Sequence, residues 1–319
     1  MSRSAKLLAF VDFVKKLSVR GKEVVRPGLK ETVEDTGMVR NEGVRRARLG
    51  TLLLYAIKSC ASQSIFPELS PDGWPITSTG LLYDREFMLV DPSSGKALSQ
   101  KKHPRMALIK PSIDIERGIL TVEAKGMEDL VLPLPELAGF GTPPLSSTSS
   151  DGDSLDLDLK STLLCGKLVK SSRVSPLADR WFSTFLNLLH IKLCRLPLDW
   201  TSCHAHFDAS PSPLPTVPLP LPGHVEAFWE DAANLVKIGE LVFANLGRCR
   251  RCLMVGINQV TGERTKEPLS TLSKHRKSTK NGRVEFGSHM YWREDLVVGE
   301  SVGLPRLRVG DKVSFWVSG

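Results

Sequence analysis

Residues 80–115 read GLLYDREFMLVDPSSGKALSQKKHPRMALIKPSIDI. Short runs of apolar, β-branched and aromatic residues recur here at intervals of about ten residues, separated by proline, glycine and polar residues. Asp91–Gly95 has the composition of a hairpin turn. The pattern extends outward to TLLLYAIKS at 51–59 and to ERGILTVEAKGMEDLVLPL at 116–134. Regularly spaced short strands are typical of barrels and sandwiches, so the sequence predicts a mostly β chain of the α+β class.

A few helices are expected to interrupt the strands. SPLADRWFSTFLNLLH has apolar residues at helical spacing and Pro176 near its start, which predicts a helix over 176–190. Six further elements or segments follow from the same rules: helices near 224–235 and near 268–277, strands over 241–246, 252–259 and 311–318, and a turn at 261–262.

Composition divides the chain into segments. Six prolines fall between Pro211 and Pro222, which excludes a core element and predicts an extended or disordered linker. Residues 141–155 are loop by composition. The expected organisation is a basic N-terminal extension at 1–50, a β-barrel-like domain at 51–140, a loop and helix connection at 141–200, a Pro-rich linker at 201–223 and a domain core at 224–319.

Charge and hydrophobicity exclude several classes of protein. The chain has 319 residues and a net charge of +8, and residues 1–50 hold 12 basic and 6 acidic side chains, so only two net charges lie beyond residue 50. Nucleic-acid binding needs a clustered basic face, so no nucleic-acid partner is expected. No apolar run approaches the roughly 18 residues of a membrane span, so no membrane span is expected.

Cysteine content and the N-terminus bear on the compartment. Six cysteines are too few for a disulfide scaffold, which favours a reducing compartment and a cytoplasmic location. Residues 1–20 have apolar residues at helical spacing with lysine and arginine between them, which predicts an amphipathic helix. A basic amphipathic start leaves a mitochondrial location as the alternative.

Two cysteines three residues apart lie among arginines in LGRCRRC, residues 246–252. Nearby positive charge favours thiolate over thiol, so at least one of Cys249 and Cys252 is expected to be more ionised than a free thiol at neutral pH. A thiolate is either a nucleophile or a ligand for a soft metal. Two alternatives stay open, namely a zinc site completed from 203–206 and a buried cysteine pair without chemistry.

A second charged group follows the first predicted strands. It comprises Lys58, Ser59, Arg85 and the KKHPR segment at 101–105. Arginine binds phosphate through two parallel hydrogen bonds and lysine supplies a point charge, so cations at strand ends can converge on an anionic group. The alternative is that these residues are solvated strand ends.

Together these segments resemble one family. YAIKSC, GLLYDREFMLVD and LSQKKHPRMALI look like the N-terminal β-barrel half of the MOSC proteins, named for the molybdenum cofactor sulfurase C-terminal domain. AFWEDAANL through LSKHRK, followed by VEFGSHMYW, looks like the MOSC domain itself. NLGRCRRCLMV with TGER and EPLSTL is most similar to eukaryotic molybdenum cofactor sulfurases, and the mitochondrial amidoxime-reducing component is the next relative. The likeness runs from about 51 to 315 with one gap.

The resemblance implies a MOSC N-terminal β-barrel followed by a MOSC β-barrel domain with a few short helices. It also implies that molybdopterin is the cofactor and that sulfur is transferred to it. The second cysteine matches the family best, so the resemblance makes Cys252 the catalytic residue and molybdenum ligand, with Cys249 in reserve. It implies that the pterin and its phosphate are held by Lys58, Ser59, Arg85, Arg248 and Arg251.

Two departures from the family keep other functions open. The proline-rich 201–223 replaces a cofactor-contacting strand, so the pocket is incomplete or the stretch is a gene-model error. Residues 1–50 cannot contain a desulfurase domain, so pyridoxal phosphate is not expected and a separate cysteine desulfurase would supply sulfur. The alternatives are a molybdenum-dependent reductase of N-hydroxylated compounds, served by an electron-donor protein, and a non-catalytic MOSC remnant.

Overall fold

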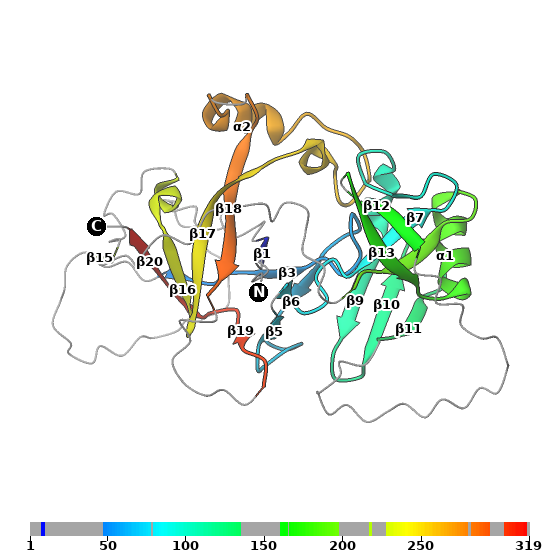
Figure 1. The fold of residues 1–319 in the computed structure, drawn as a ribbon, viewed down its shortest axis with the longest axis horizontal. Coiled ribbons are helices and arrows are strands. Elements are labelled where there is room, and N and C mark those ends of the chain that lie inside the picture. Colours follow the sequence, from blue (N-terminus) through cyan, green and yellow to red (C-terminus); the bar gives the residue numbers. More distant parts are fainter. Residues whose placement is uncertain are drawn as a thin grey trace, which may run out of the picture.

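The computed structural model describes residues 47–77, 79–134, 160–164, 166–197, 228–279, 282–293 and 303–317, together with short strands at 8–9 and 217–218. Strands dominate these residues, which contain only two α-helices, and the predicted mostly β class is confirmed. Two groups of strands lie side by side, one on the left and one on the right of Figure 1, and shorter strands run between them.

The left-hand group is one antiparallel sheet of seven strands. Its order is β1 (Leu8–Ala9), β18 (Glu285–Trp292), β17 (Leu241–Arg250), β16 (Leu235–Ile238), β20 (Lys312–Val317) and β15 (Val217–Pro218), and β2 (Ala47–Arg48) also pairs with β20. The first twenty residues were expected to be helical. This is wrong for Leu8–Ala9, which pairs with Met290 and His289 as a strand.

The right-hand group contains a closed barrel and a three-stranded sheet. The barrel order is β12 (Lys160–Leu164), β13 (Lys167–Arg173), β14 (Lys192–Arg195), β7 (Phe87–Asp91) and β8 (Lys96–Ala97), and the sheet order is β11 (Leu130–Pro133), β10 (Ile119–Glu123) and β9 (Lys110–Asp114). The predicted turn at Asp91–Gly95 is confirmed, because it joins the antiparallel pair β7 and β8. Asp91 stabilises it by accepting hydrogen bonds from the hydroxyls of Ser93 and Ser94.

Short strands connect the two groups. They are β3 (Leu52–Leu54) with β4 (Gln63–Ile65), and β19 (Arg306–Leu307) with β5 (Trp74–Thr77) and β6 (Gly80–Leu81). One cluster of buried side chains includes Ile57 and Phe182 from one half and Phe243 and Phe315 from the other. A shared core holds the halves together, so residues at their junction have defined positions.

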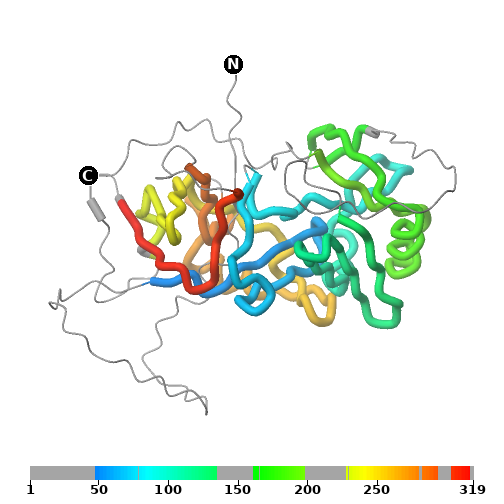
Figure 2. Tube along the Cα trace, turned by 90° about the horizontal axis from the view of Figure 1, so that it is seen from below, coloured from blue at the N-terminus to red at the C-terminus, as the bar shows by residue number. Residues whose placement is uncertain are grey.

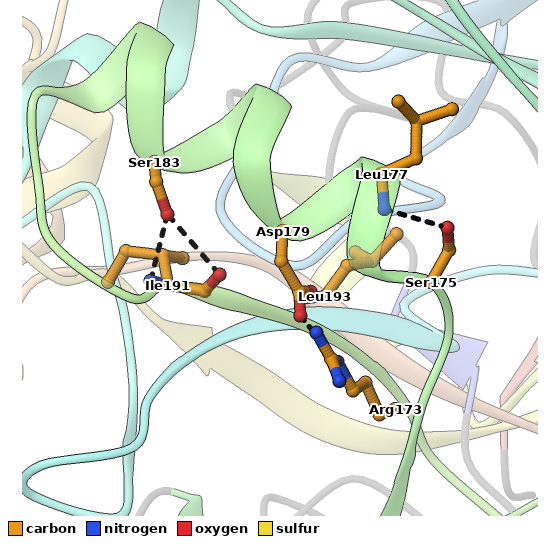
Figure 3. Close-up of polar contacts among 7 residues, drawn as sticks. All are labelled: Arg173, Ser175, Leu177, Asp179, Ser183, Ile191 and Leu193. Carbon is orange, nitrogen blue, oxygen red and sulfur yellow. Dashed lines mark hydrogen bonds and ion pairs between the residues drawn. The ribbon is translucent and has the colours of Figure 1, made fainter. Parts of the chain in front are cut away.

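The predicted helix over 176–190 is confirmed as α1 (Pro176–Leu186), which packs on the barrel (Figure 3). The Ser175 hydroxyl accepts a hydrogen bond from the Leu177 N–H and caps the first turn. Asn187 ends the helix in the left-handed conformation with φ of 54°. This left-handed residue explains why the helix stops at 186 rather than at 190.

Asp179 of α1 ties the helix to the barrel wall (Figure 3). Its buried carboxylate accepts a hydrogen bond from the Leu193 N–H at 2.8 Å and pairs with Arg173 Nε at 2.5 Å. We expect Asp179→Ala to lower the free energy of unfolding by about 2–3 kcal/mol, because a buried N–H loses its acceptor. Urea denaturation measures this, with Asp129→Ala at an exposed site as the control. Equal midpoints for the two variants would contradict it.

Three expectations are corrected. Of the helix expected near 224–235, the described residues 228–235 form only a 3₁₀ turn, η3 (Trp229–Ala232). The strand expected over 252–259 is replaced by another 3₁₀ turn, η4 (Leu253–Gly256). The apolar run after Cys252 turns, with the Ile257 N–H donating to the Met254 carbonyl at 3.1 Å, and Gly256 packs so closely on the Thr265 carbonyl that an added Cβ would be 2.5 Å from that oxygen. The strand-like run at 106–115 begins instead with a 3₁₀ turn, η2 (Pro104–Leu108).

Other elements agree with the sequence. The helix expected near 268–277 is α2 (Leu269–Arg276), and the turn at 261–262 is present with Gly262 at φ of 72°. The 141–155 loop and almost all of the 201–223 linker lie outside the described residues. Among the helices that the structure describes, none is both long and apolar enough to span a bilayer.

Candidate functional site

The two cysteines lie where β17 ends and η4 begins. Cys249 is the penultimate residue of β17 and is partly buried, whereas Cys252 directly precedes η4 and is exposed. The pairing of β17 with β18 shifts register on both sides of Arg248. Such irregularities bend a strand and redirect its side chains. The two thiols therefore have different surroundings although they are three residues apart.

Arg251 is fixed beside the cysteines by the neighbouring strand β18. Its backbone N–H donates to the Val284 carbonyl at 2.8 Å, and its Nε donates to the Phe286 carbonyl at 2.7 Å. The guanidinium also lies over the Phe286 ring, 5.7 Å from the ring centroid. These contacts keep a positive charge next to the cysteine pair.

The environment of Cys249 raises the pKa of its thiol. Burial raises this pKa above the ordinary value, and the positive charges of Arg251 and Arg85 lower it by less. Cys249 is therefore not a cysteine that the arginine cluster makes more ionised than a free thiol, because burial outweighs the positive charges.

A buried carboxylate holds Arg248 from the opposite side. Asp231 Oδ2 lies 3.1 Å from Arg248 Nε and 2.7 Å from Arg276 Nη1. Arg276 is also buried, lies 4.0 Å from the Phe228 ring centroid and donates from Nε to the Glu285 carbonyl at 3.0 Å. One carboxylate thus joins β17, which carries the cysteines, to α2.

The N-terminal half contributes two strained residues. Ser59 and Arg85 have φ of 67° and 57°, in the left-handed region that non-glycine residues rarely adopt. Each such residue costs about 1–3 kcal/mol, and strain of this kind clusters at functional sites. Both belong to the group that the sequence analysis singled out.

Neighbouring residues fix Arg85 and Lys58. Arg85 Nη1 pairs with Asp84 Oδ2 at 2.6 Å, and its guanidinium lies 5.2 Å from the Tyr55 ring centroid. The Lys58 N–H donates to the Phe87 carbonyl at 2.7 Å. Among the described residues no carboxylate forms an ion pair with the Lys58 ammonium, so it is available to an anion.

The cysteine loop crosses to these residues. The chain after β17 leaves the left-hand sheet and runs to the half that contains β7, as both ribbon and tube show (Figures 1 and 2). Ser59 Oγ lies 4.0 Å from Met254 Sδ, two residues after Cys252. Arg85 is close enough for its charge to act on Cys249. The junction therefore brings Ser59 and Arg85 together with the cysteine loop.

Arg105 and the backbone of Lys101, in the 101–105 segment, make contacts other than those of Lys58 and Arg85. Arg105 lies over the Phe185 ring at 5.0 Å, which holds it against α1. The Lys101 carbonyl accepts a hydrogen bond from Arg264 at 2.6 Å, and Gln100 pairs with Gln259 at 3.3 Å. These backbone and amide contacts attach the loop after η4 to the N-terminal half.

The zinc alternative stays a prediction. Within the described stretches of the chain, no group of three or more His, Cys, Asp or Glu side chains could hold a metal ion. Residues 203–206, which were to complete the zinc site, lie outside the described residues.

Several residues of the site were missed from the sequence. Arg248 is held by Asp231, which also pairs with Arg276, and Arg251 is held by the Phe286 carbonyl. Arg85 is held by Asp84 and Tyr55. Asp84 adjoins Arg85 in the sequence, so its role had a local signal. The other partners come from distant segments, and no spacing rule connects Asp231 with Arg276.

Two family models match the chain, one over each half of the junction described above. Residues 46–188 match the MOSC N-terminal beta barrel domain and residues 222–314 match the MOSC domain. The chain contains both MOSC domains. The MOSC N-terminal domain carries Lys58, Ser59 and Arg85, and the MOSC domain carries both cysteines.

Relatives of this MOSC protein include molybdenum cofactor sulfurases. That of Aspergillus fumigatus is 31% identical over 76% of this chain and 37% of its own length, and that of Homo sapiens is 30% identical over 78% of this chain and 31% of its own length. The chain therefore spans about a third of each relative. A solved protein structure from Bordetella bronchiseptica covers 47% of the chain and 92% of its own, with 17% identity and a TM-score of 0.32.

Proposed function

We propose that the chain binds the molybdenum cofactor at the junction of its two MOSC domains and takes part in sulfur transfer to that cofactor. One observation carries the proposal. Of two strained residues of the first domain, Ser59 lies 4.0 Å from Met254 in the cysteine loop of the second, and Arg85 is near enough for its charge to act on Cys249. The sulfurase relatives support molybdenum cofactor chemistry for such a junction.

The residues at the junction fit an anionic, sulfur-binding group. Lys58, Arg85 and Arg251 present positive charge, which suits a phosphate and an anionic metal centre. Cys252 offers an exposed thiol, and a soft sulfur ligand suits such a metal. Ser59 adds a hydroxyl from the opposite side. We assign metal or sulfur binding to Cys252, with Cys249 secondary, and assign cofactor binding to Lys58, Ser59, Arg85, Arg248 and Arg251.

The bound cofactor would supply a molybdenum centre that can accept a terminal sulfur. The chain's contribution is to position charged groups before binding. Asp84 and Tyr55 fix Arg85, while the Phe286 carbonyl fixes Arg251, so little side-chain freedom is lost when an anion binds. The Cys252 thiol is exposed, so its sulfur can be reached by a metal or by a transferable sulfur.

Replacing Arg85 tests the proposed anion contact. We expect Arg85→Ala to reduce molybdopterin retained on purification by about tenfold, since a charge-assisted pair is lost. Arg85→Lys should recover only part of it, because lysine cannot bind through two parallel bonds. Fluorescence of the oxidised pterin measures retention, and Arg117→Ala at an exposed turn is the control. Unchanged retention in Arg85→Ala would remove Arg85 from the site.

A further inference from the structure

A cavity of about 360 Å³ is lined by residues of β9 and β10 and adjoins the candidate site, because Tyr55, whose ring carries Arg85, also lines it. The sheet contributes Lys110, Ser112 and Glu123 to its wall. The opposite wall comes from Tyr55 and Gln63 of the N-terminal half and from Gln259 of the MOSC domain. A volume of this size accommodates a small molecule.

Hydrogen bonds hold these walls in place. The Gln63 amide donates to the Ile113 carbonyl at 3.0 Å and accepts from the Ile113 N–H at 2.7 Å. The Gln259 amide donates to the Ile257 carbonyl at 3.0 Å. The cavity is therefore formed before a ligand arrives, which reduces the entropic cost of binding.

Opposite charges lie side by side at its mouth. Lys110 and Glu123 are direct partners in the antiparallel register of β9 and β10, so their side chains project from the same face. Both are exposed, and no ion pair in the described part of the chain joins them to each other or to another residue. The hydroxyls of Ser62 and Ser112, which also line the cavity, form no hydrogen bond within the described residues.

We propose that this cavity binds a free α-amino acid. The carboxylate would pair with Lys110 and accept from the two serine hydroxyls, and the ammonium would pair with Glu123. The Tyr55 ring, with Ala61 and Pro111, supplies an apolar surface for a short side chain. Each part of the zwitterion thus meets a group of complementary chemistry. The proposal does not depend on cofactor binding.

Ligand-observed NMR titration of the full chain, free of cofactor and in 150 mM salt, tests it. L-alanine is the probe, and propionate and ethylammonium, which each carry one of its two charges, are the controls. We expect L-alanine to bind saturably and at least about tenfold more tightly than either control. Lys110→Met and Glu123→Gln should each weaken it by about tenfold. Lys167→Met, at an exposed site on β13, should leave it unchanged.

The exchanged pair Lys110→Glu with Glu123→Lys should restore most of the affinity, because opposite charges remain on one face. Circular dichroism should be the same for all variants, since both side chains are exposed. No saturable binding, equal binding of propionate and L-alanine, or affinity unaffected by Lys110→Met and Glu123→Gln would each overturn the proposal.

Discussion

Cys252→Ser is expected to reduce the molybdenum bound after loading with molybdopterin by at least about tenfold, while Cys249→Ser retains most of it. Metals bind the deprotonated thiol, so burial that disfavours the thiolate and blocks access makes a thiol the poorer ligand. Cys252 is exposed, whereas burial raises the pKa of Cys249. Serine is nearly isosteric with cysteine, so these variants test the sulfur rather than the packing.

Two measurements report on each variant. Elemental analysis gives the ratio of molybdenum to protein, and cyanide treatment releases sulfur bound to the cofactor for colorimetric assay. Loss of both signals only in Cys249→Ser would reverse the assignment. Unchanged signals in both variants would favour a MOSC remnant without sulfur chemistry.

Arg276→Leu is expected to lower the free energy of unfolding by about 3–5 kcal/mol. Removing one partner of a buried ion pair leaves the other without compensation, and Asp231 would keep only the half-exposed Arg248. Leucine also removes the guanidinium that packs on the Phe228 ring. Urea denaturation with a check of the m-value measures the change.

A neighbouring lysine provides the matched control. Lys277→Leu makes the same change of charge at an exposed position and should shift stability by less than about 0.5 kcal/mol. Asp231→Asn combined with Arg276→Leu should cost less than the sum of the single variants, because both remove one interaction. Strict additivity would show that the two residues act independently.

Much of the fold could be predicted because hairpins are local. β7 pairs with β8, and β9, β10 and β11 pair in sequence order, so alternation and turn residues were sufficient for these hairpins. The errors lie where distant contacts decide local structure. The apolar run after Cys252 has the composition of a strand, but Gly256 packs against the Thr265 carbonyl and the chain turns into η4.

The candidate site was only partly predictable. Arginine and cysteine spacing indicated where charge and sulfur lie, and family resemblance supplied candidate roles. The sequence could not show that burial outweighs the arginines at Cys249, since the pKa depends on hydration in the folded chain. Nor could it show the strain at Ser59 and Arg85, because no glycine marks either position.

The pairing of β19 with β5 and of β2 with β20 has a consequence for synthesis on the ribosome. Arg306 pairs with Pro75 of β5, which also pairs with nearby β6, whereas Ala47 of β2 pairs with Val313, so among the described strands β2 finds its partner only in β20. Contacts of such long sequence separation form late and slow folding. During translation β2 therefore stays without this partner until β20 has been synthesised, and chaperones should protect its unpaired edge during that interval.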